Sequence, residues 1–245
     1  MSKILQREKD NTKIAKNSMP TWSLSFAPHK LSGYNVCPHA TEGCINSCVG
    51  KGGLAVVYPQ ILQRRIEKTR FFFERRQEFL AQLKAELFAA DKYCAKRGIV
   101  GRVRLNTFSD VRWDVIPALE LASFSNLRFY DYTKSVDSAL ASLNSPHYFR
   151  VYSLNEKSTV VDTLEVLRSG GNVAVVFDVE YNPAHNKFGA LPETYMGYSV
   201  IDGDVTDDRY SDPRGVIVGL RLKGTKAMRQ VARQESFAVL TVNGK

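Results

Sequence analysis

Three of the four cysteines in this 245-residue chain lie within twelve residues of one another. Cys37, Cys44 and Cys48 have the spacing C-x6-C-x3-C, and Cys94 follows much later. Cysteine thiolates are the ligands that zinc and iron–sulfur clusters take from proteins. In a reducing compartment, clustered thiols hold a metal more often than they form a disulfide. The spacing therefore predicts a metal site at Cys37, Cys44 and Cys48.

The spacing alone does not choose between zinc and iron. A structural zinc site takes four ligands, usually as two close cysteine pairs, and only Cys44 and Cys48 form such a pair here. A fourth ligand would have to be His29, His39 or the distant Cys94. Three thiolates without a fourth are instead suited to a [4Fe–4S] cluster that leaves one iron open to a substrate or cosubstrate. We favour the cluster and keep zinc as the alternative.

Polar side chains follow each predicted strand of the chain at the point where the strand ends. The carboxyl ends of parallel strands meet at one edge of a sheet, where α/β proteins build their active sites. We therefore expect these side chains to converge beside the cysteines, although Asp110 and Asn155 could equally cap helices. The candidate catalytic residues are Asp110, Asp131, Lys134 and Glu156. The candidate substrate-binding residues are Asn106, Ser109, Tyr132, Ser153, Asn155 and Asp178.

The period of the apolar residues predicts the elements that position these groups. Strands that alternate with helices imply a parallel sheet with right-handed crossovers. The predicted strands are 21–28, 100–108, 126–133, 147–154, 172–179 and 215–222, and the predicted helices are 58–97, 110–124, 134–143 and 158–170.

The fold class expected from this alternation is α/β, as a partial (β/α)6 TIM-like barrel of parallel strands. An open, doubly wound sheet is the alternative. We expect residues 1–20 to form a polar basic arm and residues 21–245 a single barrel-like domain. A long irregular insert, 180–214, precedes the last strand. It carries five aspartates, Asp202, Asp204, Asp207, Asp208 and Asp212, and we expect a solvated, turn-rich loop there, with a lid over the site as the alternative.

The formal net charge of +9 is concentrated near the two ends of the sequence. Residues 1–30 hold six Lys and Arg against two acids, and residues 221–245 hold six against one. A basic surface of this size favours a polyanionic partner, and a nucleic acid or nucleotide is the first candidate. No apolar run is long enough for a membrane helix, and the first residues lack the apolar core of a signal peptide. We expect a cytoplasmic protein with no membrane partner; the sequence leaves its oligomeric state open.

A three-cysteine loop after the first strand of a six-unit partial barrel resembles the radical S-adenosylmethionine enzymes. That resemblance covers roughly 21–222 and implies a [4Fe–4S] cluster with S-adenosylmethionine. It departs from the usual C-x3-C-x2-C spacing, and "NTFSD" stands where those enzymes carry a glycine-rich segment. The pieces "SGYNVCPHATEGCINSC", "RLNTFSD" and "LRFYDYTK" resemble more closely a family of tailed-phage proteins, which implies a phage origin and, for a phage protein, the host cytoplasm.

Three functions are compatible with these features. The first, which we favour, is a metal-dependent enzyme that modifies a nucleic-acid base or nucleotide by radical chemistry. The second is a base-exchange enzyme similar to tRNA-guanine transglycosylases, inserting a deazaguanine into DNA, with zinc and with Asp110 or Asp131 as nucleophile. The third is a zinc-stabilised nucleic-acid-binding protein without catalysis.

Overall fold

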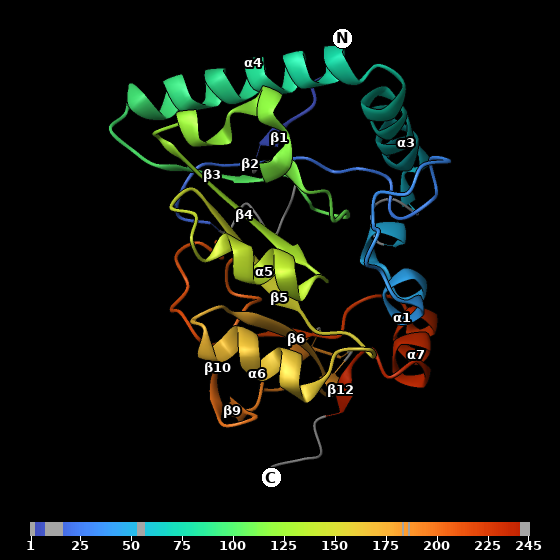
Figure 1. Ribbon diagram of the computed structural model, residues 1–245. Helices are drawn as coiled ribbons and strands as arrows, with labels where there is room; N and C mark the ends of the chain where they lie inside the picture. The colour runs from blue at the N-terminus through green and yellow to red at the C-terminus, as the bar shows by residue number, and fades with distance from the viewer. Residues whose placement is uncertain (1–2, 8–16, 53–56, 183, 186, 241–245) are drawn as a thin grey trace.

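The computed structural model describes residues 3–7, 17–52, 57–182, 184–185 and 187–240. One large, mostly parallel sheet runs through the molecule (Figure 1). Six of its strands are parallel and lie in the sheet in the order of the chain. They are β2 (Thr21–Ser23), β3 (Gly101–Arg104), β4 (Leu127–Thr133), β5 (Tyr148–Ser153), β6 (Val173–Asp178) and β11 (Ile217–Arg221).

Shorter strands extend both ends of this parallel sheet. The strand β10 (Tyr198–Asp202) pairs in parallel with β11, and β9 (Thr194–Tyr195) pairs with β10 in the antiparallel sense. At the other end, β1 (Gln6–Arg7) is antiparallel to β2. Away from both ends, β12 (Val239–Leu240) pairs in parallel with β6. A separate hairpin consists of β7 (Tyr181–Asn182) and β8 (Lys187–Phe188).

The mostly parallel sheet confirms the predicted α/β class. Within the described residues its terminal strands, β1 and β9, do not pair with each other, so the sheet is open. The barrel-like curvature therefore stays a prediction. Strands that follow one another in a single direction, joined by right-handed crossovers, place their helices on one side of the sheet. The helices here are α1 (Glu42–Asn46), α3 (Pro59–Glu74), α4 (Arg76–Ala95), α5 (Val136–Ser142), α6 (Val160–Arg168) and α7 (Lys226–Gln234).

An aromatic cluster joins α3 and α4 to the first strands of the sheet. The ring of Phe26 lies 5.3 Å from Phe72 of α3, 5.8 Å from Phe79 of α4 and 5.9 Å from Trp113. All four side chains are almost completely buried. Both helices pack on this one cluster, and the chain bends between them at Arg75, whose ψ of 52° is not helical. The single helix predicted over 58–97 is therefore two helices.

The predicted helix over 110–124 is also wrong. The segment forms three 3₁₀ turns instead: η4 (Trp113–Val115), η5 (Pro117–Leu119) and η6 (Leu121–Ser123). Pro117 has no N–H to continue a helix, and Glu120 adopts a left-handed φ of 47°. These short turns let Leu119 and Leu121 enter the core beneath α4.

The sheet face opposite the helices carries a buried network of charges. Asp207 and Asp208 of the Asp-rich segment are buried and pair with Arg104 at 2.7 Å and Arg102 at 2.8 Å. Arg209, which is fully buried, pairs with Asp212. The solvated loop expected for the Asp-rich segment is therefore wrong at its centre, because its carboxylates neutralise arginines that point out of β3. The insert also contributes β10 to the main sheet.

The first residues of the predicted basic arm belong to the core of the domain. Ile4 and Leu5 are 1% and 5% exposed, and their backbone N–H groups donate to the carboxylate of Glu86 at 2.9 and 2.7 Å. Residues 1–2 and 8–16 of that arm, 183 and 186 of the insert and the basic end 241–245 lie outside the described residues.

The buried pair of Arg104 and Asp207 gives a test of this architecture. Asp207→Ala leaves the Arg104 guanidinium without its carboxylate beneath the loop, and such a loss costs about 3–5 kcal/mol of folding free energy. We expect a large fall in the denaturant midpoint, measured by circular dichroism. Glu78→Ala removes a surface pair with Arg75, whose side chains are 52% and 54% exposed, and is the matched control, with no measurable change expected. Equal midpoints for the two variants would contradict the buried network.

Candidate metal centre and catalytic mouth

The cysteine loop lies at the carboxyl edge of the sheet, against the chain that leaves β3. The Cys37 thiol donates to the carbonyl of Phe108 at 3.4 Å, and the Asp110 N–H donates to the carbonyl of Val36 at 2.8 Å. Gly50 is packed so closely that a Cβ there would lie 2.7 Å from Pro28 and 2.9 Å from Phe108. The loop is thus fixed on the exit of β3 by backbone and side-chain contacts together.

Glu156, which follows β5, holds the short helix that carries Cys44. Its Oε1 accepts from the backbone N–H of Gly43 at 2.8 Å, and its Oε2 accepts from the Thr41 hydroxyl at 2.8 Å. Thr41, the N-cap residue of α1, makes no side-chain cap of its own. A distant carboxylate therefore satisfies the first turn of α1, an arrangement that the positive end of a helix favours.

The three thiols are half-buried and close enough for their charges to interact. Burial raises the pKa of all three, that of Cys37 to about 12. The charges of Cys44 and Cys48 each act on Cys37, and Cys44 acts on Cys48. Thiols in such surroundings stay protonated unless a cation binds them, because burial penalises the thiolate. The loop therefore collects thiols that a metal could deprotonate.

Lys134 places one cation beside these thiols. Its Nζ donates to the Ser153 hydroxyl and to the Leu154 carbonyl, both at 2.9 Å, and lies 4.9 Å from the centre of the Phe237 ring. Burial lowers the pKa of this amine, whereas Cys44, Asp110 and Glu156 each raise it. Lys134 is thus a positive group among the thiols and carboxylates of the mouth.

Asp110 lies between the cysteine loop and the end of β4. Its Oδ2 accepts from the Thr133 hydroxyl at 3.1 Å and from the Lys134 backbone N–H at 2.9 Å. Burial raises the pKa of this carboxyl, although both hydrogen bonds oppose the shift. A raised pKa brings a carboxylate closer to the range in which it exchanges protons with a substrate.

Several predicted site residues meet at this edge, which we call the mouth. Asp178, at the end of β6, also reaches it through a two-contact ion pair with Arg233 of α7. The predicted residues that lie around Lys134 and the cysteine loop are Cys37, Cys44, Cys48, Asp110, Ser153 and Glu156.

Asn106 and Asp131 instead point into the core on the helix side of the sheet. Asp131 is fully buried; its carboxylate accepts from the Asn106 backbone and side chain at 2.7 and 3.2 Å, and from the Tyr148 hydroxyl. Burial raises its pKa to about 7. Asn106 in turn accepts from the Trp113 indole at 3.0 Å and from Ser109 at 2.8 Å. These hydrogen bonds hold β3, β4 and β5 together, and they occupy the carboxylate and amide oxygens that a ligand would need.

Two further predicted residues serve local structure. Tyr132 lies on the opposite sheet face, where the guanidinium of Arg104 is 4.7 Å from its ring centre. The Asn155 side chain accepts from the Lys157 backbone N–H at 2.9 Å and so shapes the turn after β5.

Sequence reasoning missed the part that the last helix plays at the mouth. Phe237 lies over Lys134, and the Met228 sulfur would be 3.0 Å from a Cβ on Gly52. Asn46 of α1 donates to Glu235 at 2.8 Å. The three cations of α7 at positions 226, 229 and 233 were the available signal of an amphipathic helix.

The described side chains do not form a finished metal site. Among the residues that the structure describes, no three His, Cys, Asp or Glu side chains are placed as a ready ligand set. The donor chemistry, three thiols of one loop beside a cation, still matches a group held by three thiolates. The thiol side chains would have to turn toward one another on binding.

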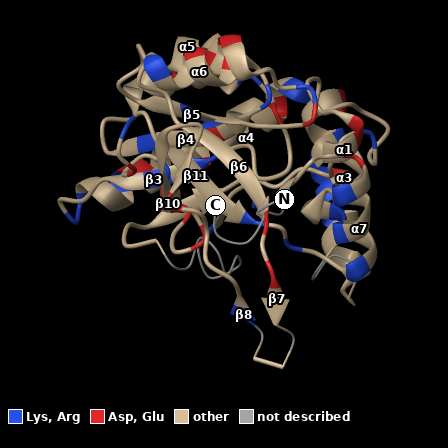
Figure 2. Ribbon diagram, turned by 90° about the horizontal axis from the view of Figure 1, so that it is seen from below, with Lys and Arg blue, Asp and Glu red and all other residues tan. Residues whose placement is uncertain are grey.

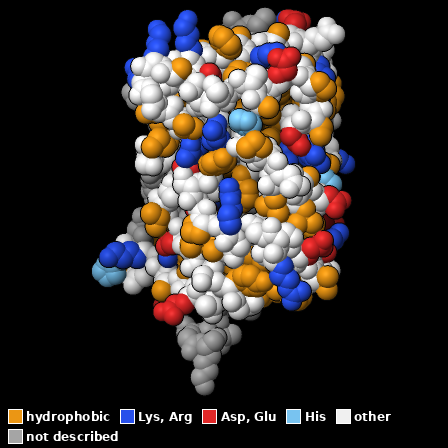
Figure 3. All heavy atoms as spheres, turned by 60° about the vertical axis from the view of Figure 1, so that its left-hand side comes forward, with side chains coloured by type: hydrophobic (Ala, Val, Ile, Leu, Met, Phe, Trp, Pro, Cys, Tyr) orange, Lys and Arg blue, Asp and Glu red, His pale blue; other side chains and the backbone are white. Residues whose placement is uncertain are grey.

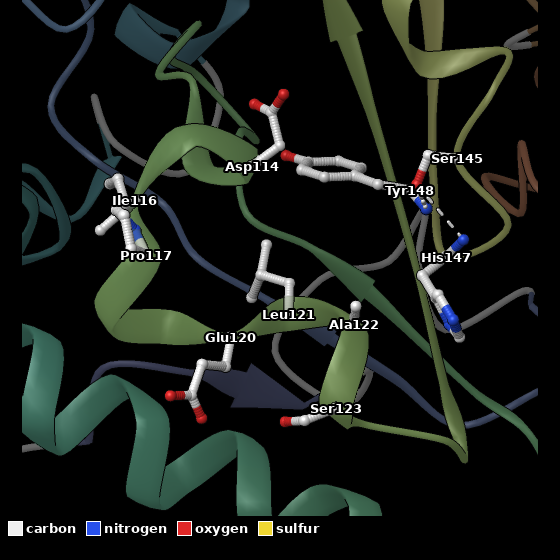
Figure 4. A pocket seen from close by; sticks show the side chains of 10 residues that line it. All are labelled: Asp114, Ile116, Pro117, Glu120, Leu121, Ala122, Ser123, Ser145, His147 and Tyr148. Carbon is white, nitrogen blue, oxygen red and sulfur yellow. Dashed lines mark hydrogen bonds between the residues drawn. The ribbon is translucent and has the colours of Figure 1, made fainter.

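A separate hollow of about 380 Å³ lies away from the mouth, between the 3₁₀ turns and the start of β5 (Figure 4). Its two acidic groups are already paired, Asp114 with Arg112 at 2.8 Å and with Arg150, and Glu120 with Lys84 at 2.9 Å. Tyr148, another lining residue, uses its hydroxyl on Asp131. Both carboxylates and this hydroxyl are thus engaged, and we assign the candidate site to the mouth.

Comparison with known protein families gives one match. The family model described as Gene product 88 matches residues 3–238, which is nearly the whole chain. The chain belongs to the Gene product 88 family. This name agrees with the bacteriophage origin that the sequence motifs predicted. No curated protein and no solved structure matches this Gene product 88 protein. None of its described helices combines the length and apolar character of a membrane span.

The contact between Glu156 and α1 predicts how the thiols react. Glu156→Ala removes two hydrogen bonds to a carboxylate, each worth about 1.5–3 kcal/mol. Because α1 then opens more readily, we expect Cys44 to react with a disulfide reagent at least about tenfold faster. The rate is measured in chelator-treated protein, as the rate at which the reagent releases its own thiol on reaction with the cysteine.

Glu165→Ala, on the exposed side of α6, is the control for this rate. Cys94, which is fully buried, should stay silent in both proteins and report that they remain folded. An unchanged rate for Cys44 in folded Glu156→Ala protein would refute the holding role of Glu156.

Proposed function

We propose that this protein is a metal-dependent enzyme that modifies a nucleic-acid base or a nucleotide, with an iron–sulfur cluster held by Cys37, Cys44 and Cys48. One observation carries the proposal: the three half-buried thiols of a single loop lie together at the carboxyl edge of a parallel sheet, with Lys134 and Asp110 against them. In parallel α/β proteins this edge is where chemistry takes place.

The order of the strands supports the cluster over a structural zinc. Six parallel strands follow the chain order, and the cysteine loop leaves the first of them, β2. This is the arrangement of the partial barrels that use S-adenosylmethionine. No fourth cysteine adjoins the loop, because Cys94 packs in the core beside Gly101. When bound, such a cluster would supply the electron that cleaves S-adenosylmethionine to a carbon radical.

The protein's own groups then have distinct tasks. Lys134 would bind an anionic part of the substrate, since its charge faces the mouth and two of its N–H bonds already fix its direction. Asp110 would hold or accept a proton beside it. Glu156 positions the loop, and the rings of Phe108 and Phe237 exclude water from either side.

The base-exchange alternative has less support. It needs a carboxylate nucleophile that reaches a sugar, and of the two candidate nucleophiles, Asp110 and Asp131, the one that lies at the mouth is Asp110. Asp131 is enclosed by donors from three directions. A zinc-bound protein with Asp110 as nucleophile remains the second candidate function.

Metal loading separates these candidates. After anaerobic reconstitution with iron and sulfide, we expect about four irons per chain and a broad visible absorption that bleaches in air. The variants Cys37→Ala, Cys44→Ala and Cys48→Ala should each lose most of this absorption. Cys94→Ala is the matched control and should load like the unchanged protein, because its thiol is remote from the loop.

The chemistry is tested on the loaded protein with a reductant and S-adenosylmethionine. Formation of 5′-deoxyadenosine, lost in the three loop variants and kept in Cys94→Ala, is the expected result. Stoichiometric zinc with no iron uptake would overturn the proposal and favour the base-exchange candidate.

A further inference from the structure

A wall of basic side chains stands beside the mouth and has no role in the proposed chemistry. In Figure 2, Lys and Arg mark α3 and α7 on one flank of the molecule, and Asp and Glu mark α5 and α6 on another. We call this wall the basic rim; it consists of Lys51, Arg64, Lys226, Arg229 and Arg233.

The contacts between its elements make the basic rim continuous. The helix α7 packs on the turn η3 (Val49–Lys51) through Met228 and Gly52. Arg65 of α3 donates to the Gly50 carbonyl of the same region at 3.0 Å. The helices α7 and α3 are therefore both packed on the segment that ends the cysteine loop.

One cation of α7 is placed where the helix itself disfavours it. Lys226 is the first residue of α7, and this first turn contains no acid. The N-terminal end of a helix carries partial positive charge, so a lysine there is unfavourable without an anion. Arg229, one turn on, has its guanidinium 5.0 Å from the centre of the Tyr181 ring. The position of Lys226 therefore favours an anion bound at this end of α7.

Apolar side chains stand exposed on the same wall. Val49 is 53% exposed, Val57 66% and Tyr58 47%. Tyr58 immediately precedes α3, and Val49 begins η3. A surface that alternates cations with an exposed aromatic ring suits a chain of phosphates with unpaired bases, because bases stack on aromatic rings while phosphates bind Lys and Arg. In a duplex those base faces are hidden.

The opposite side of the molecule lacks this pattern. Figure 3 shows the left-hand side of Figure 1, where Lys and Arg are scattered among apolar and acidic side chains.

We infer that the basic rim and Tyr58 bind single-stranded nucleic acid and lead one of its bases to the mouth. Delivery of the base rests on the proposed function, whereas binding of the strand does not. The substrate is then a base within a single strand, and a free nucleotide, which meets few of these charges, binds far more weakly.

Binding is measured by fluorescence anisotropy with a labelled oligothymidylate of about 16 nucleotides. The double variant Arg64→Glu with Lys226→Glu changes two exposed cations for which the structure gives no ion pair. We expect affinity to fall at least about tenfold and the salt dependence to lose about two units of slope. Tyr58→Ala should weaken binding about fivefold or more with an unchanged salt slope, because stacking carries no charge.

Lys92→Glu with Lys96→Glu, two exposed cations at the far end of α4, is the matched control and should keep its affinity. An equal loss in this control would show unspecific attraction and overturn the inference. Equal affinity for a duplex would also overturn it. Failure to bind the oligonucleotide at all would overturn it too, and would favour an acidic protein as the partner of the basic rim.

The two proposals fail separately. Strand binding without iron loading would refute the cluster and leave the basic rim in place. Iron loading and S-adenosylmethionine cleavage without strand binding would refute the basic rim and leave the cluster. Both are measured on the full chain.

Discussion

The buried carboxylate of Asp131 is the contact on which the geometry of the mouth depends. It accepts from Asn106 beyond β3 and from Tyr148 of β5, while its own backbone belongs to β4. Asn106 extends the connection to Trp113 and so to the aromatic cluster under α3 and α4. Three neighbouring strands and the loop after β3 are thereby held in one register, with every polar atom of the hub satisfied inside the core.

The mouth follows from that hub. Asp110 follows Asn106 by four residues, and Lys134 follows Asp131 by three. The hydrogen bonds between Asp131, Asn106 and Tyr148 therefore fix the positions of both residues. The cysteine loop then docks on this edge through Val36 and through Glu156. The result is a combination of half-buried thiols, a half-buried amine and a buried carboxyl, each with a pKa displaced by its loss of water. Groups of this kind gather at functional sites because burial is costly without a purpose.

The charged side chains of the protein fall into two groups, buried ion pairs and exposed cations. On the sheet face away from the helices, arginines of β3 are neutralised by Asp207 and Asp208, so that these charges stabilise the fold and do not reach the surface. Exposed cations of α3 and α7 lie instead beside the mouth, where solvent and ligands have access. A net charge alone could not have distinguished these two populations, although the same residue types make up both.

The sequence by itself determined the alternation of strands and helices, the cysteine loop after the first parallel strand, and the set of polar residues at the strand ends. Those features depend on local periodicity and spacing. Only the tertiary structure decided which strand ends serve the mouth. Asp110, Lys134 and Glu156 reach it. Asp131 and Asn106 instead point into the core, where Asp131 binds Tyr148 of the next strand. Tyr132 points to the opposite face of the sheet, because side chains alternate along β4. The physical reason is that a polar side chain near a strand end pairs with whatever donors packing brings to it, and those donors come from residues far away in the chain.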